Sequence, residues 1–119
     1  MVKFGVFWHR YDNKFLIEVG KLIYNYNEKT WYFLYDKEGV EDALKLGFQL
    51  FPEFPDLQKE YKSSKLFITF LNRIDDNLTR KYPLITEEEK INKINENKAI
   101  IETDNIFLEE KNQNVKKRR

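Results

Sequence analysis

Alternation of apolar and polar residues in the first third of the chain constrains the fold more than any other feature. It runs through three segments, residues 2–9, 15–26 and 30–36, which the polar clusters RYDNK and NEK separate. Period-two alternation is typical of strands that bury one face, and short polar clusters are typical of tight turns. The sequence therefore predicts an antiparallel β-meander, with Gly20 marking a bulge or a close backbone approach.

The middle of the chain has helical and irregular patterns. Helix formers in KEGVEDALKLG predict a short helix that ends at Gly47. The prolines of FQLFPEFPDL predict an irregular loop across the sheet. In the next helix, KLFITFLNRI, we expect Ser63 or Ser64 at the N-cap and an apolar stripe at Leu66, Phe70 and Ile74.

The apolar density falls after Asp75. Thr86 and Glu89 have the spacing of a capping box, and Ile91 and Ile94, followed by Ala99 and Ile100, supply the apolar side chains of a helix. Thr103 or Asp104 is expected to cap a last short helix, NIFLEEK.

These elements predict an α+β fold. We expect a small antiparallel β-meander or barrel-like sheet, packed by one or two helices and followed by a helical C-terminal appendage. The predicted units are a domain at residues 1–76, the helical appendage at 77–111 and a basic disordered tail at 112–119.

The inventory of reactive side chains is small for an enzyme. The chain has no cysteine and one histidine, His9, so a Ser–His or Cys–His pair cannot form without that residue. Asp75 and Asp76 favour a solvated helix end, and the run Glu87–Glu89 favours a helix N-terminus over a metal site. We therefore expect no catalytic residues, no metal and no cofactor. Loss of an activity on changing His9 would favour a small enzyme instead.

The chain is close to neutral, with 21 basic and 20 acidic residues, so no overall field favours nucleic acid or anionic lipid. No apolar run approaches the roughly 18 residues of a membrane span, and the N-terminus lacks the pattern of a secretory signal. The absence of cysteine fits a reducing compartment. We expect a cytoplasmic protein with no membrane partner.

Binding to nucleic acid by a small barrel-like protein is the alternative function. Aromatic residues exposed on a curved sheet stack on bases, and the candidates are Tyr24, Tyr26, Tyr32 and Tyr35. Acidic residues lie near them in the sequence, whereas a groove for phosphates is basic. We therefore favour packing for the tyrosines and a solubilising role for the tail Lys116–Arg119, and we do not expect direct nucleic-acid binding.

Several short segments, taken in order, resemble the N-terminal subdomain of HipA-type serine/threonine kinases. They are VGKL at residues 19–22, WYFLYD at 31–36, a proline-containing loop, and SKLFITFLNRIDD at 64–76. The family has a V-G-x-L strand, an F-x-Y strand, a proline-rich loop and a helix with a Leu-aromatic pair. Two segments depart from the family: LKLGFQLFPEFPD replaces its Pro-Leu-Ser-Leu-Ser-Leu-Pro run, and RIDD lacks the proline of R-I-P-D.

The resemblance implies a non-enzymatic role, because the residues after 76 are too few for the ATP site and catalytic loop of a kinase. A free-standing subdomain is similar to the HipS-type subunit of three-component HipB, HipS and HipT toxin–antitoxin systems, which binds and restrains the kinase toxin. The expected partner is a HipA/HipT-like kinase, and the same system implies a HipB-like DNA-binding protein.

In such systems a bulky aromatic residue of the small subunit enters the kinase active site, and by motif position the resemblance implies Phe67. Large aromatic side chains concentrate binding free energy at interfaces. The flanking prolines favour exposure of Phe51 and Phe54, whereas Phe67 also fits the apolar row of its helix, so core packing stays open for it. The expected partner-binding residues are Phe51, Phe54, Leu57, Tyr61 and Phe67.

Overall fold

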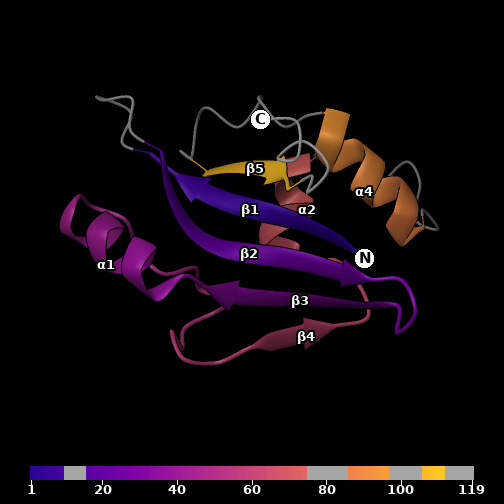
Figure 1. The fold of residues 1–119 in the computed structure, drawn as a ribbon, viewed down its shortest axis with the longest axis horizontal. Coiled ribbons are helices and arrows are strands. Elements are labelled where there is room, and N and C mark those ends of the chain that lie inside the picture. Colours follow the sequence, from indigo (N-terminus) through magenta and orange to yellow (C-terminus); the bar gives the residue numbers. More distant parts are fainter. Residues whose placement is uncertain (10–15, 75–85, 97–105, 112–119) are drawn as a thin grey trace, which may run out of the picture.

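The computed structural model describes residues 1–9, 16–74, 86–96 and 106–111. Its strands are β1 (Val2–Trp8), β2 (Ile17–Asn25), β3 (Thr30–Tyr35), β4 (Tyr61–Ser63) and β5 (Ile106–Glu110). Its helices are α1 (Lys37–Lys45), α2 (Ile68–Ile74) and α4 (Glu87–Glu96). The strands form one antiparallel sheet in the order β4-β3-β2-β1-β5, which is not closed into a barrel within these residues (Figure 1). The predicted α+β class is confirmed.

The predicted meander corresponds to β1, β2 and β3. The alternate side chains of β1 are buried, as a strand with one covered face requires: Val2, Phe4, Val6 and Trp8. The β1–β2 register shifts where Val6 pairs with Gly20 and Phe7 with Glu18. Val19 is the extra residue of a bulge directly before Gly20, and a Cβ on Gly20 would lie 2.8 Å from the Leu34 carbonyl oxygen, so the structure has both the bulge and the close backbone approach that were the alternatives for Gly20.

Local hydrogen bonds fix both ends of α1. The Asp36 carboxylate accepts a hydrogen bond from the Gly39 N–H at 3.0 Å, which satisfies one free donor of the first turn. At the other end Gly47 has a φ of 115°, and the Phe48 N–H donates to the Ala43 carbonyl at 3.0 Å. This positive φ suits glycine and closes the helix in a Schellman motif. The predicted end at Gly47 is confirmed.

One face of the sheet is covered. Cross-strand pairing places Phe4, Leu22 and Phe33 in one row, and all three are fully buried. Helix α2 reaches this face through Phe70, whose ring centroid lies 5.6 Å from that of Phe33. In Figure 1, α2 lies behind the strands, so the opposite face of the sheet is turned toward the viewer.

Helix α4 begins with the predicted capping box. The Thr86 Oγ1 accepts from the Glu89 N–H at 3.1 Å, and the Glu89 carboxylate accepts from the Thr86 N–H at 3.0 Å. Ile91 and Ile94 are buried in the same core as the strands, as predicted. Among the described helices, none combines the length and the apolar composition needed to cross a membrane.

The helix predicted over NIFLEEK is wrong, because Ile106–Glu110 form β5 and pair with β1. Val6 pairs with Leu108 in this ladder, and Leu108 is buried. A helix this short is marginal in isolation, whereas an available neighbouring strand supplies backbone partners. The predictions for Asp75, Asp76, Ala99, Ile100, Thr103, Asp104 and residues 112–119 lie outside the described residues.

Candidate functional site

Phe51 and Phe54, which we expected to be exposed, are instead buried in the core. Their exposed fractions are 5% and 0%. Phe54 stacks on Phe33 with ring centroids 4.3 Å apart and an interplanar angle of 21°. Its ring also meets that of Tyr61 at 4.9 Å. Both rings of the proline-containing loop are part of the core, so the prediction of exposure is wrong.

A buried tyrosine on β3 holds the loop against the sheet. The Tyr35 hydroxyl accepts a hydrogen bond from the Phe51 N–H at 2.9 Å and donates one to the Phe54 carbonyl at 2.7 Å. The Phe54 N–H donates to the Phe51 carbonyl at 2.9 Å, which closes the turn between them. The hydroxyl therefore satisfies two backbone groups that the loop brings into the core.

This hydroxyl makes stability sensitive to alkaline pH. Burial raises the pKa of Tyr35 from 10.0 to about 12, although the hydrogen bond from Phe51 acts in the opposite direction. Between pH 10 and 12 the phenol of the unfolded chain loses its proton while the folded chain keeps it. The contribution of Tyr35 to stability is thus complete below pH 10 and is lost by about pH 12.

We therefore expect the free energy of unfolding to fall more steeply with pH in the unmodified protein than in Tyr35→Phe. Urea denaturation at a series of alkaline pH values measures both slopes. Tyr26→Phe is the matched control, because the Tyr26 side chain is 43% exposed, and its slope should lie nearer to that of the unmodified protein than the slope of Tyr35→Phe does. Equal slopes for the unmodified protein and Tyr35→Phe would contradict this prediction.

Phe67 is a core residue, which resolves the alternative left open by the sequence. Its side chain is 6% exposed, and its ring meets that of Phe54 edge-on at 5.0 Å. Its carbonyl accepts from the Phe70 and Leu71 N–H groups, so Phe67 stands immediately before α2. The N-cap predicted at Ser63 or Ser64 is wrong, because Ser63 ends β4 and the helix starts later, at Ile68.

Ile68 is the prominent exposed residue of this region, and our expected site did not include it. Its side chain is 58% exposed, although it directly follows the buried Phe67. A carboxylate from the proline loop fixes this turn: Glu53 Oε1 accepts from the Thr69 N–H at 2.8 Å and from Thr69 Oγ1 at 2.6 Å. The sequence does contain a signal for this exposure, the adjacent apolar residues Phe67 and Ile68. At the start of an amphipathic helix only one of two adjacent residues points into the core.

Leu57 and Tyr61 keep part of their surface in solvent and pack on the core from outside. The Tyr61 hydroxyl accepts from the Asp56 N–H at 2.8 Å, which brackets the turn that contains Leu57. Tyr61 and Phe67 both contact Phe54, so this turn and the start of α2 meet at one buried ring. We call the partly or largely exposed apolar residues of these two segments, Leu57, Tyr61 and Ile68, the Phe54 rim.

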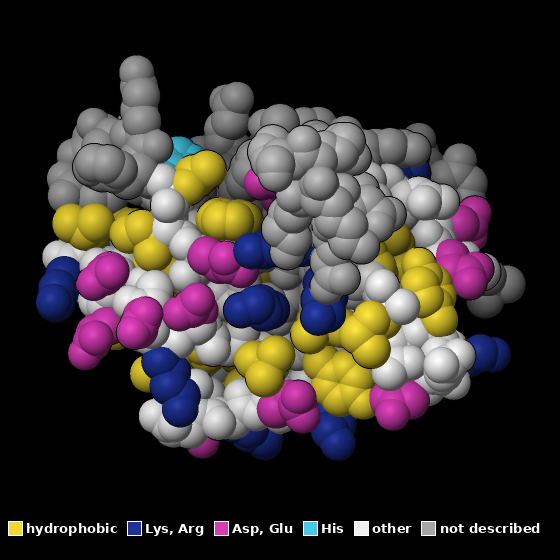
Figure 2. Space-filling model, in the orientation of Figure 1, with side chains coloured by type: hydrophobic (Ala, Val, Ile, Leu, Met, Phe, Trp, Pro, Cys, Tyr) yellow, Lys and Arg dark blue, Asp and Glu magenta, His cyan; other side chains and the backbone are white. Residues whose placement is uncertain are grey.

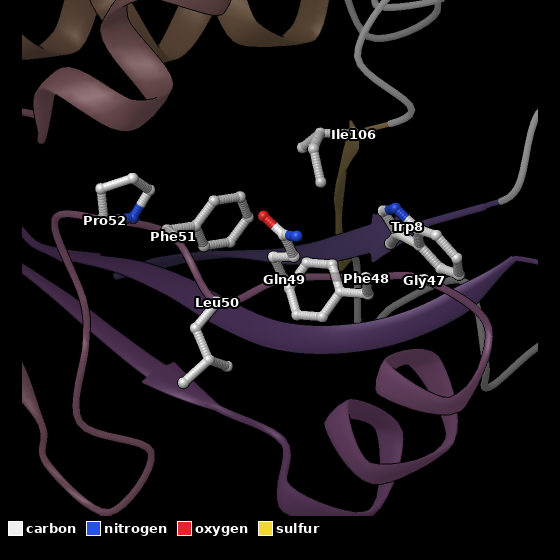
Figure 3. A pocket seen from close by; sticks show the side chains of 8 residues that line it. All are labelled: Trp8, Gly47, Phe48, Gln49, Leu50, Phe51, Pro52 and Ile106. Atoms are coloured by element: carbon white, nitrogen blue, oxygen red, sulfur yellow. The ribbon is translucent and has the colours of Figure 1, made fainter.

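A cavity of about 290 Å³ opens where β1 and β5 meet the loop after α1 (Figure 3). The rings of Trp8 and Phe48 meet in its wall with centroids 5.8 Å apart. Its volume is near the lower limit for small-molecule sites, about 300–1,000 Å³. We did not predict it, because its walls come from segments far apart in the sequence. They are Trp8, Gly47, Phe48, Gln49, Leu50, Phe51, Pro52 and Ile106.

The tyrosines considered for base stacking divide into two groups. Tyr24 and Tyr35 are buried, in agreement with the packing we favoured for them. Tyr26 is exposed, and Tyr32 is half-buried on the opposite face of the sheet, where its hydroxyl donates to the Glu28 carboxylate. His9 directly follows β1 and is half-buried. Within the part of the chain that the structure describes, no group of three His, Cys, Asp or Glu residues is placed to hold a metal ion.

Compared with protein-family models, with curated proteins and with solved structures, the chain matches none.

Proposed function

We propose that this protein is a non-enzymatic binding protein that docks on and inhibits a separate HipA/HipT-like serine/threonine kinase toxin. The observation that carries the proposal is the order of the segments on which the resemblance rests. VGKL lies in β2, WYFLYD covers β3, and the proline loop and SKLFITF lead into α2. Phe33 of β3, Phe67 before α2 and Phe70 of α2 all contact the ring of Phe54, and β2 pairs with β3, so these segments belong to one structural unit.

The structure changes which residues we propose as the contact. Phe67 is the residue implied by the resemblance, but its ring is committed to Phe54 and the core. Interface hot spots are large side chains that a partner desolvates, so a partner gains most from surface that is still exposed. We therefore assign the contact to the Phe54 rim, with Ile68 as its most exposed member and with the buried Phe67 directly before it in the chain.

We expect Ile68→Asp to abolish protection against the kinase. Cells would co-express the protein with a HipA/HipT-like kinase whose gene lies beside its own and which lacks this subdomain. A hot-spot loss of about 2 kcal/mol weakens affinity about 30-fold, which purified proteins would show by calorimetry. A charge placed in a desolvated contact is expected to cost at least that much.

Leu44→Asp is the matched control, because Leu44 is 46% exposed on α1 and lies outside the Phe54 rim. This variant should protect cells as well as the unmodified protein does. Failure of the unmodified protein to bind or restrain the kinase would refute the proposed function. Full protection by a folded Ile68→Asp variant would refute only the contact. The proposal also implies a cytoplasmic location and a HipB-like DNA-binding protein in the same system.

A further inference from the structure

The face of the sheet opposite the core carries a mixed surface of lysines, aromatic rings and aliphatic side chains. Pairing places Lys3, Ile23, Tyr32 and Lys62 in one row across β1 to β4. Lys21 pairs with Leu34 in the next row. Figure 2 shows this face, with basic and hydrophobic side chains side by side. We call it the open face, made of Lys3, Phe7, Lys21, Ile23, Tyr32, Leu34 and Lys62.

The lysines of the open face carry uncompensated charge. Within the described residues, Lys3, Lys21 and Lys62 form no ion pair with a carboxylate. Glu18, the carboxylate beside Phe7, is held by Lys111 at 2.8 Å. The other carboxylates near these rows lie at the margins of the face: Glu109 on the edge strand β5, Glu28 in the turn between β2 and β3, and Glu60 directly before β4. The interior of the face therefore favours an anionic partner.

Two aromatic rings of the open face each lie close to a lysine, Tyr32 to Lys62 and Phe7 to Lys111, which is paired with Glu18. The Lys62 Nζ is 5.9 Å from the centroid of the Tyr32 ring, and the Lys111 Nζ is 5.8 Å from that of Phe7. Tyr32 lies on β3 and Phe7 on β1, both interior strands of the sheet. Proteins that bind single strands combine such rings, on which bases stack, with cations that follow the phosphates. Lysines by themselves bind any anionic surface. Aromatic rings beside lysines favour a partner that has bases as well as phosphates.

We propose that the open face binds single-stranded nucleic acid. From the sequence we do not expect this function, because acidic residues lie close to the tyrosines along the chain. Pairing of the strands instead places Ile23 and Lys62 on either side of Tyr32, and Glu28 is occupied with the Tyr32 hydroxyl. The open face lies across the sheet from α2, so this inference does not rest on the proposed kinase contact.

The test uses the full chain and a fluorescein-labelled single-stranded oligonucleotide of mixed sequence, as DNA and as RNA, with binding followed by anisotropy. We expect binding at low salt that weakens as salt is added. Each of Lys21→Gln and Lys62→Gln should reduce the slope of log K against log salt by about 0.7, the value for one contact to a single strand. Lys45→Gln on α1 is the matched control and should leave the slope unchanged.

Aromatic stacking is tested by two changes at one position. Tyr32→Leu should weaken binding about tenfold, whereas Tyr32→Phe keeps the ring and should bind as the unmodified protein does. Absence of binding at low salt would overturn the proposal. Binding that disappears on removing Lys116–Arg119 but is insensitive to the changes on the open face would assign it to the tail and would also overturn it. Circular dichroism spectra matching the unmodified protein confirm that each variant is folded.

Discussion

Phe54→Ala is expected to remove about 3–5 kcal/mol from the free energy of unfolding, which urea denaturation measures. The Phe54 side chain is fully buried and its ring stacks on Phe33, so truncation removes apolar burial and leaves a cavity in the core. Native domains have free energies of unfolding of about 5–15 kcal/mol, so this single substitution would remove a large fraction of the stability. It would also remove the support beneath Tyr61 and Phe67.

Ile68→Ala is the matched control, because it truncates an apolar side chain that is exposed instead of buried. Ile68 is apolar but 58% exposed, and its truncation should change the free energy of unfolding by no more than about 0.5 kcal/mol. A loss below about 1 kcal/mol for Phe54→Ala, or equal losses for the two variants, would show that the proline loop does not pack as the structure has it.

The sequence alone predicts an element correctly where the signal comes from residues close in the chain. Alternation in residues 2–8 predicts one buried face for β1, and Thr86 with Glu89 predicts the start of α4, because both signals depend on residues close in the chain. Gly47 is a further example, since a positive φ at a helix end is a local requirement.

The sequence does not predict a strand whose pairing strand is distant in the chain. β5 pairs with β1 about 100 residues earlier, and nothing in IFLEE distinguishes an edge strand from a short helix. β4 has three residues and is defined by its pairing with β3. In both, tertiary context decides the conformation over local propensity.

The aromatic loop shows the same limit at the candidate site. The residues Phe51, Phe54 and Phe67 are equally apolar in the sequence, and all three are buried. What fixes the loop is the Tyr35 hydroxyl, which reaches two backbone groups 16 and 19 residues further along the chain. The exposed member of the region, Ile68, is identified by its place at the start of α2 rather than by its residue type.

A partly buried carboxylate joins α4 to the rest of the fold. Glu87 Oε1 accepts from the Trp31 Nε1 at 2.8 Å and from the Leu66 N–H at 3.0 Å, and Glu87 Oε2 accepts from the Lys90 Nζ at 2.8 Å. The side chains of Lys90 and Glu87 are 8% and 18% exposed. One side chain thus satisfies donors from β3, from the segment before α2 and from its own helix.

Glu87→Ala is expected to cost about 3–5 kcal/mol of the free energy of unfolding, because it leaves the cation of Lys90 and two buried donors without an acceptor. The matched control is Glu88→Ala, which removes the same charge from an exposed neighbour and should cost no more than about 0.5 kcal/mol. Adding Lys90→Met to Glu87→Ala removes the stranded cation, so the double variant should be more stable than Glu87→Ala alone. Urea denaturation measures the free energy of unfolding of all three variants. A double variant no more stable than Glu87→Ala would show that the loss comes from the Trp31 and Leu66 donors and not from the buried charge.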